Sequence, residues 1–373
     1  MSFEYEALTD RIAAIAAERA TEVDAGSFPA HTITALAESG LLGLISARDA
    51  GGAGEGLAAA AHVVERLARE CASSAMVACM HYCGTQVIET HGPMDVRRDI
   101  AAGRHLTTLA FSEAGSRSHF WAPVGTAADD GTSVRLNARK SWVTSANHAD
   151  SYVWSSKPVA GEQASTLWLV PRTTAGLHVA EAGFDGIGLR GNDSSPVAAD
   201  DAEVSYHARL GEDGAGFDIM MSTVLPWFSV LSAAVSNGLM EAAVRKTAAH
   251  AGATRFAHMG SAIADLPTVR AYIARMRIAA DQNKALVADA ITAITTERED
   301  AMMRVLQVKA AAGESATMVT DLAMRVCGGA AFRKEVGVER IFRDARAALV
   351  MGPTTDVLYD FIGKAECGLP LFA

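Results

Sequence analysis

The 373-residue sequence predicts a mainly helical α+β protein, with an N-terminal helical domain, a strand-rich middle domain and a C-terminal helical bundle. Three observations predict this order. Apolar residues recur at helical spacing in the first hundred residues, short runs rich in Val, Thr and aromatics follow, and long helical patterns fill the C-terminal half. The composition changes twice, so we expect domains at 1–103, 104–212 and 213–373.

The N-terminal domain is predicted to alternate helices with short breaks. Phe28-Pro29 ends the first helical stripe, and the glycine-rich stretch 46–56 must be a loop. Apolar helices are expected at 57–67 and 72–88. The histidines of this region lack acidic or cysteine partners at ligand spacing, so His62, His81 and His91 are predicted to be packing or surface residues.

The middle domain is predicted from short strand-like runs separated by turn residues such as Asp129-Asp130-Gly131. Several short strands at this spacing suggest a compact sheet or a β-barrel-like domain. The predicted strands are 107–112, 133–136, 152–155, 166–170 and 203–206.

The C-terminal domain is predicted to contain three long helices, at 217–250, 264–298 and 301–326. Helices of ~30 residues reach ~45 Å, which suits a bundle that also packs against other subunits.

A segment near the C-terminus, 327–355, carries several weak signals of an anion site. Gly328 and Gly329 follow a helix, where a residue free to adopt positive φ lets the chain turn and leaves a bare backbone loop. Ordinary helix capping explains the same pair. The next helix is expected to be supported by the pairs Glu339–Arg343 and Arg340–Asp344, four residues apart. Pro353 is expected at the first position of a further helix, with Thr354, Thr355 and Asp356 in its first turn.

Composition excludes several classes of protein. A net charge of −10 argues against nucleic acid or an anionic membrane as the main partner. The five cysteines are odd in number and lack paired ligand spacing, so neither a disulfide framework nor a metal site is predicted. A reducing cytoplasm fits best. The N-terminus lacks the order of a signal peptide, and no apolar run is expected to reach the ~20 residues of a membrane span.

Four motifs in order resemble the acyl-CoA dehydrogenase superfamily, and the similarity spans nearly the whole chain. These motifs are Phe111–Ser118, Lys140–Ser145, Val326–Phe332 and Glu339–Ala345. The resemblance implies an FAD enzyme with an N-terminal helical domain, a middle β-domain and a C-terminal four-helix bundle, assembled as a homodimer or homotetramer.

The resemblance also implies where the cofactor lies. Phe111 and Ser112 would lie along the isoalloxazine, the Trp142 indole would pack on it, and the Thr144 hydroxyl would approach N5, where a donor stabilises the reduced form. Taken alone, Trp142 is better explained as a strand aromatic in the core. The full set of expected FAD-binding residues is Phe111, Ser112, Ser118, Trp142, Thr144, Gly328, Gly329, Thr354, Thr355 and Asp356, with the two glycines admitting the adenosine of a neighbouring subunit's FAD.

Two departures from the family pattern concern the catalytic base. Alignment of Pro353-Thr354 with the family's Gly-Thr places Gly352 where a glutamate usually removes the α-proton, and the alternative base position holds Trp227. Neither side chain accepts a proton. Glu113, His119 and Asp356 are the substitutes to consider. The structural explanations are favoured for each: a loop role for Glu113, an exposed position for His119 and a first-turn position for Asp356.

Three functions remain open from the sequence. The first is dehydrogenation of an acyl thioester with a non-standard base and an electron acceptor. The second is a reduced-flavin-dependent monooxygenase served by a flavin reductase, which needs no α-proton abstraction, and whose non-CoA substrate would suit an aromatic lining of Phe120, Trp121, Trp227 and Phe228. The third is a flavin-binding subunit that has lost the chemistry.

Overall fold

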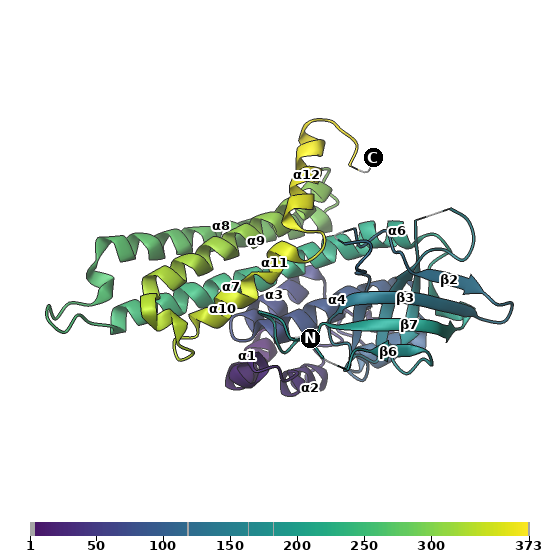
Figure 1. Ribbon diagram of the computed structural model, residues 1–373, viewed down its shortest axis with the longest axis horizontal. Coiled ribbons are helices and arrows are strands. Elements are labelled where there is room, and N and C mark those ends of the chain that lie inside the picture. The colour runs from purple at the N-terminus through teal and green to yellow at the C-terminus, as the bar shows by residue number, and fades with distance from the viewer. Residues whose placement is uncertain (1–3, 118, 163, 182, 372–373) are drawn as a thin grey trace.

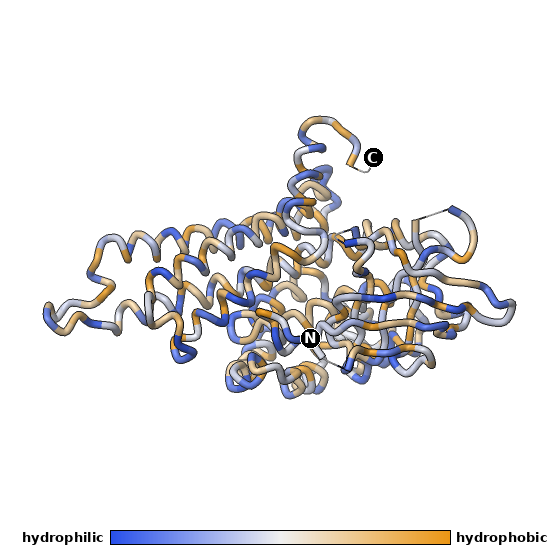
Figure 2. The backbone as a smooth tube through the Cα atoms, viewed as in Figure 1, coloured by the Kyte–Doolittle hydropathy of each residue, from blue (hydrophilic) through white to orange (hydrophobic). Residues whose placement is uncertain are grey.

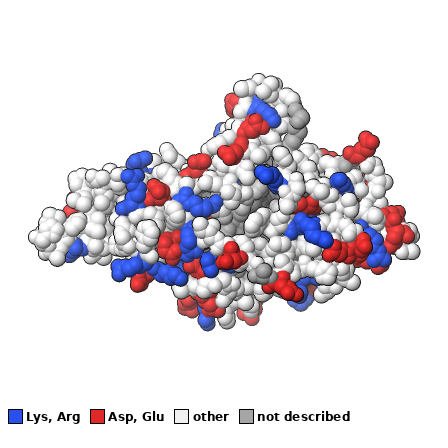
Figure 3. All heavy atoms as spheres, viewed as in Figure 1, with Lys and Arg blue, Asp and Glu red and all other residues white. Residues whose placement is uncertain are grey.

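The computed structural model describes residues 4–117, 119–162, 164–181 and 183–371. The predicted order of helices, strands and helices is confirmed (Figure 1). The long C-terminal helices extend from one end of the molecule, the strands form the other end, and α12 projects from the body. Figure 3 shows acidic and basic side chains intermixed over the face in view.

The N-terminal part consists of helices, as predicted. They are α1 (Tyr5–Asp24), α2 (Ala30–Glu38), α3 (Leu57–Ala68), α4 (Ala72–His91) and α5 (Met94–Ala101). His81 is fully buried in α4, where its Nε2 lies 3.0 Å from the carbonyl oxygen of Leu42 and its Nδ1 accepts the N–H of Thr107. Burial lowers the pKa of His81 to about 4, so the ring stays neutral as a packing residue.

The strand-rich middle domain is confirmed: it forms two four-stranded sheets, and the described strands do not close into a barrel. One sheet has the order β1-β4-β5-β8 and the other β2-β3-β7-β6. Buried side chains of both sheets, including Leu136, Trp154 and Trp168, form one apolar cluster, so the sheets pack as two layers. The strands are β1 (Thr107–Ala110), β2 (Thr126–Asp129), β3 (Val134–Val143), β4 (Ser151–Ser156), β5 (Thr166–Pro171), β6 (Leu177–Val179), β7 (Ser195–Val204) and β8 (Arg209–Leu210).

The three long C-terminal helices are also confirmed. After α6 (Gly216–Ile219) and a π-helical turn at Met220–Val224, the chain forms α7 (Leu225–Ala253), α8 (Pro267–Thr295) and α9 (Ala301–Cys327). The hydropathy of these helices varies along the chain with apolar and polar stretches interleaved (Figure 2). Helix α7 is central, because it packs on α3 and α4 as well as on α8 and α9.

One helix contradicts the expectation that no apolar run is long enough to span a membrane. The continuous helical stretch Gly216–Ala253 contains an 18-residue window with a mean hydropathy of 1.6, which is sufficient by length and composition. However, 78% of that window is buried inside the protein. Its apolar character is explained by its place in the core, where it contacts other helices on most sides.

The C-terminal segment differs in detail from its prediction. Gly328 has a φ of +54° and opens a 3₁₀ turn after α9, as a positive-φ helix end requires, and α10 (Val338–Ala345) and α11 (Ala347–Val350) follow. Helix α12 runs from Thr355 to Glu366, with Thr354 as its N-cap. Pro353 therefore lies before the helix, and its prediction as the first helical residue is wrong.

Only one of the two predicted ion pairs on α10 forms. Arg343 Nε donates to Glu339 at 2.7 Å, as predicted. Asp344 instead turns inward and accepts the N–H of Leu189 at 2.7 Å, while Arg340 reaches the carbonyl oxygen of Glu70 at 3.4 Å. The predicted Arg340–Asp344 pair is wrong because Asp344 faces the loop before β7 rather than the exposed side of its own helix.

Candidate active site

A cavity of about 880 Å³ lies where the three parts of the chain meet. Helices α4 and α7, the segment after β1, the end of β3, the loop before β7 and the segment around α11 all contribute to its walls. Its lining includes Met76, Met80, Phe111, Ser112, Glu113, Phe120, Trp142, Thr144, Gly188, Leu189, Asn192, Ser194, Phe228, Arg343, Arg346, Met351, Gly352 and Thr354.

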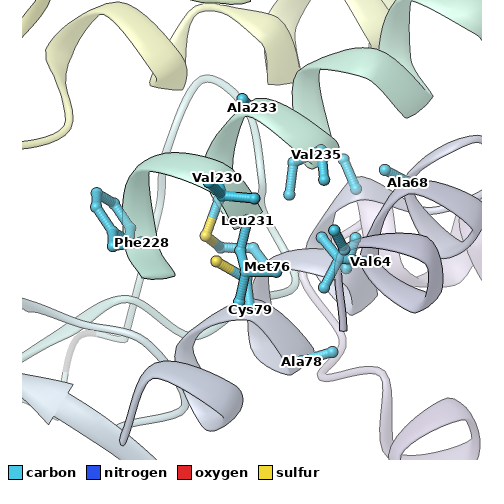
Figure 4. Close-up of a cluster of buried hydrophobic side chains, with 14 of the residues drawn as sticks. Val64, Ala68, Met76, Ala78, Cys79, Phe228, Val230, Leu231, Ala233 and Val235 are labelled. Carbon is cyan, nitrogen blue, oxygen red and sulfur yellow. The ribbon is translucent and has the colours of Figure 1, made fainter. Parts of the chain in front are cut away.

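The residues of α4 and α7 that form the helical wall of the cavity belong to the main apolar core. Figure 4 shows Met76 on α4 and Leu231 on α7 within one buried cluster, with Phe228 at the edge of the group. Met76 and Phe228 also line the cavity, so this wall is apolar and rigidly supported.

Trp142 presents its ring to the cavity. The pairs Lys140–Val197 and Val143–Ser195 leave two residues of β3 opposite one residue of β7, which is a β-bulge. At this bulge the Trp142 side chain is 65% exposed, and its ring meets Phe184 edge-on at 6.3 Å. The interpretation of Trp142 as a buried strand aromatic is therefore wrong.

Polar groups also line the cavity that Trp142 borders. The hydroxyl of Thr144 lies 3.2 Å from that of Ser194. The Oδ1 of Asn192 and the Nε of Arg346 are buried without a hydrogen-bond partner among the described residues. Buried polar atoms normally have partners, so this cavity is suited to a ligand that supplies both a donor and an acceptor.

The two arginines of the cavity have different electrostatic surroundings. Arg343 donates to Asp24 at 2.6 and 2.9 Å and to Glu339, which raises its pKa against the effect of burial. Arg346 forms no ion pair with a described residue, stacks on the Phe342 ring at 4.0 Å and has its pKa lowered by burial. Arg346 is thus a cation whose charge remains available to a ligand.

Glu113 is the carboxylate among the described lining residues, and it has a structural role. Its Oε1 accepts from Lys140 Nζ at 2.6 Å, and its Oε2 accepts the N–H groups of Val124 and Gly125 at 2.6 and 2.9 Å. Lys140 also donates to the carbonyl and hydroxyl oxygens of Ser155. Oε1 therefore ties the segment after β1 to β3 and, through Lys140, to β4, while Oε2 holds the backbone just before β2.

The structure brings five of the ten expected cofactor residues to this cavity, namely Phe111, Ser112, Trp142, Thr144 and Thr354. Thr355 is buried, and Asp356 lies with His119 and Trp121 at a second cavity of about 690 Å³. Gly328 and Gly329 lie at the end of α9 with open space where side chains would be. Ser118 is outside the described residues.

Of the remaining candidates for catalysis and aromatic lining, some line the main cavity and others lie elsewhere. Gly352, Phe120 and Phe228 line the main cavity. Trp227 is partly buried against the core, and Trp121 lies at the second cavity, so neither contributes to the main wall. Sequence reasoning missed Asn192 and Arg346, because nothing in their local sequence shows that Asn192 Oδ1 and Arg346 Nε are buried without a hydrogen-bond partner among the described residues.

Three family models match consecutive parts of the chain. Residues 4–102 match the acyl-CoA dehydrogenase N-terminal domain, 108–202 its middle domain and 214–366 its C-terminal domain. The chain is 28% identical over 360 residues to cyclohex-1-ene-1-carbonyl-CoA dehydrogenase of Geobacter metallireducens, covering 94% of this chain and 93% of the relative. It is also 28% identical over 382 residues to an L-prolyl-(peptidyl-carrier protein) dehydrogenase of Pseudomonas fluorescens, covering 98% and 99%.

Solved structures share the fold at lower identity. Butyryl-CoA dehydrogenase from Megasphaera elsdenii superimposes with a TM-score of 0.90 at 21% identity, covering 98% of this chain and 97% of that one. The FAD complex of PigA gives a TM-score of 0.88 at 20% identity, covering 99% and 98%.

Proposed function

Because the chain belongs to the acyl-CoA dehydrogenase superfamily, whose members are flavin-dependent oxidoreductases acting on CH–CH bonds, we propose that it is an FAD enzyme that dehydrogenates an acyl thioester. The observation that carries the proposal is the exposed face of Trp142 beside Thr144 in a cavity with apolar helical walls.

The residues of the cavity fit a flavin. An isoalloxazine offers a flat ring to the Trp142 face and carries both hydrogen-bond donors and acceptors, which match the unpartnered Asn192 Oδ1 and Arg346 Nε. FAD, when bound, supplies the hydride acceptor. We assign the remaining expected FAD contacts, Phe111, Ser112, Ser118, Gly328, Gly329, Thr354, Thr355 and Asp356, as part of the same proposal.

The substrate class follows from the relatives and from the apolar wall. One relative acts on a CoA thioester and another on a carrier-protein thioester. The wall of Met76, Met80 and Phe228 offers an apolar surface to an acyl chain. We therefore propose an acyl thioester, with the carrier to be identified by experiment.

Proton abstraction is proposed to use a non-standard base. The aligned base positions hold Gly352 and Trp227, and Glu113 is engaged by Lys140 and two backbone N–H groups. His119 and Asp356 border the second cavity rather than the main one. The proton acceptor would then come with the substrate or from a neighbouring subunit.

The lack of a proton acceptor at the aligned base positions, Gly352 and Trp227, favours a second candidate function. A reduced-flavin-dependent monooxygenase of this fold needs no acceptor for an α-proton, and a lining without an uncommitted described carboxylate suits it. A flavin reductase would be its partner, whereas a dehydrogenase would pass electrons to an acceptor such as an electron-transferring flavoprotein.

An anaerobic titration separates the two functions. The purified protein, reconstituted with FAD, is mixed with a panel of acyl-CoAs and carrier-protein thioesters while the flavin absorbance is recorded. Bleaching with formation of an enoyl product supports dehydrogenation. Absence of bleaching, together with oxygen uptake and a product gaining one oxygen atom when a reductase and NADH are supplied, supports monooxygenation instead.

We also propose that 1–103, 104–212 and 213–373 are the domains of the chain and that it forms a homodimer or homotetramer. Exposed apolar side chains on α8 and α9, Ile278, Met302 and Met318, support an interface on the bundle. Sedimentation equilibrium measures the assembly directly.

A further inference from the structure

Lys309 is a buried lysine directed at backbone carbonyls. It lies in the N-terminal third of α9 and is 1% exposed. Its Nζ donates to the carbonyl oxygens of Pro353 at 2.7 Å, Met351 at 2.9 Å and Ala348 at 3.4 Å. Below its pKa of about 7 the side chain is an ammonium with three N–H groups, so its full donor capacity is then directed at one backbone segment.

The three carbonyls belong to the segment that forms one wall of the main cavity. Ala348 lies in α11, and Met351 and Pro353 lie in the link to α12. Met351, Gly352 and Thr354 line the cavity. The carbonyls of Met351 and Pro353 lie on either side of Gly352. Because Gly352 has no side chain, contacts to the backbone around it must fix its position.

A buried ammonium without a counter-ion is costly, which makes a purely space-filling role for Lys309 a poor explanation. Lys140 is equally buried, but it is compensated by Glu113 at 2.6 Å. Lys309 forms no ion pair with a described residue, and burial lowers its pKa to about 7, against the stabilising effect of the three carbonyls. Leu or Met would fill the same volume without this cost.

We propose that Lys309 is a positioning residue of the cavity: its three donors fix the backbone on both sides of Gly352 and so set the wall formed by residues 350–354. Lys309 does not line the cavity itself, but its Nζ lies 5.8 Å from the ring centre of Phe228, which does. The ammonium therefore contacts both the 350–354 segment and Phe228 from the side away from the cavity. The inference rests on the proposed function only in taking this cavity as the active site.

The test is amide hydrogen exchange of the flavin-free protein. Lys309→Met keeps the volume and removes the donors, and Val308→Ala is the matched control, because Val308 is the adjacent fully buried residue of α9. The Met351 amide donates to the carbonyl oxygen of Ala347 at 3.0 Å. In Lys309→Met we expect this amide to exchange roughly 10- to 100-fold faster, which corresponds to the loss of hydrogen bonds to a charged group. Core amides of α9 are expected to change much less. Val308→Ala is expected to affect α9 and the Met351 amide alike.

Equal exchange at Met351 in the two variants would overturn the inference. If Lys309→Met fails to fold, Lys309→Gln, which retains two N–H donors, takes its place and is expected to give an intermediate rate. Once a substrate is found, Lys309→Met should lower kcat/KM about tenfold and Lys309→Arg should restore part of it. Because exchange is measured without flavin or substrate, failure of the proposed function would leave the exchange result standing.

Discussion

At the scale of single residues, Trp142 is the expected FAD contact that can be tested most directly. Its ring is exposed in the cavity, whereas Trp154, on the neighbouring sheet, is fully buried. Substitutions at the two tryptophans can therefore distinguish an effect on ligand binding from an effect on stability.

We expect Trp142→Ala to raise the dissociation constant for FAD roughly tenfold, because it removes the flat partner of the ring, with a change below ~0.5 kcal/mol in the free energy of unfolding of the flavin-free protein. Fluorescence titration and urea denaturation measure the two quantities. Trp154→Phe is the control and should show the opposite pattern. Unchanged FAD affinity in Trp142→Ala would contradict the assignment of this face.

Asp344 should make stability depend on pH. It is 6% exposed, and burial raises its pKa to about 6 from an ordinary value of 3.8. The pKa of Asp344 is higher in the folded than in the unfolded state, so its ionisation lowers the free energy of unfolding. Below about pH 4 the carboxyl is protonated in both states and this loss is absent. The loss grows to roughly 3 kcal/mol by pH 6 and stays constant above it. Asp344→Asn keeps an acceptor for the Leu189 N–H and removes the charge.

The free energy of unfolding of Asp344→Asn, relative to the parent protein, should therefore increase by about 2–3 kcal/mol between pH 4 and pH 7. Urea denaturation at the two pH values gives the difference. A constant difference between the two proteins would show that the carboxylate is not penalised in the fold.

At the scale of elements, helix α7 depends on close approach to α3. A Cβ added at Gly238 would lie 2.4 Å from the carbonyl oxygen of Glu65 and 2.5 Å from the Ala68 Cβ. Both helices would have to separate. At Gly252, nearer the end of α7, an added Cβ meets nothing within 4 Å.

Gly238→Ala is expected to destabilise the protein by about 1–3 kcal/mol, although alanine is the better helix former, because overpacking outweighs propensity. Gly252→Ala should be neutral or stabilise by up to ~1 kcal/mol. Thermal unfolding of the two variants decides the matter, since propensity alone predicts the same sign for both.

Elements were predictable where their patterns are long. The helices at 301–326 and 57–67 were placed within a residue or so, because each shows several turns of apolar spacing. Strands β2, β6 and β8 were missed, since they have only two to four residues and lack the run of β-branched or apolar residues that marks the equally short β1. The start of α12 was placed too early, because the N-cap role of Thr354 depends on a local hydrogen bond to Val357.

At the scale of the whole molecule, Arg343 links all three parts of the chain. From α10 it donates to Asp24 at the end of α1 and to the carbonyl oxygen of Ile187 in the loop before β7. It is thus placed to hold the wall of the cavity in register with both helical parts.

Arg343→Met should lower the free energy of unfolding by about 3 kcal/mol, because it leaves Asp24 and Glu339, both largely buried, without their partner. Arg139→Met is the matched control: its pair with Asp200 is exposed and should be worth less than ~0.5 kcal/mol. Urea denaturation compares them, and similar losses in both variants would contradict the linking role.

The sequence by itself determined the helical and strand-rich parts, their order and the motif that contains Trp142 and Thr144, because these depend on local periodicity and short spacings. It also identified Gly352 as a position without a side chain. Only the tertiary structure decided that Glu113 is engaged by Lys140, that Arg346 has no ion-pair partner among the described residues and that Lys309 donates to the backbone carbonyls around Gly352. Those properties arise from contacts between segments far apart in sequence, whose burial and partners no local pattern records.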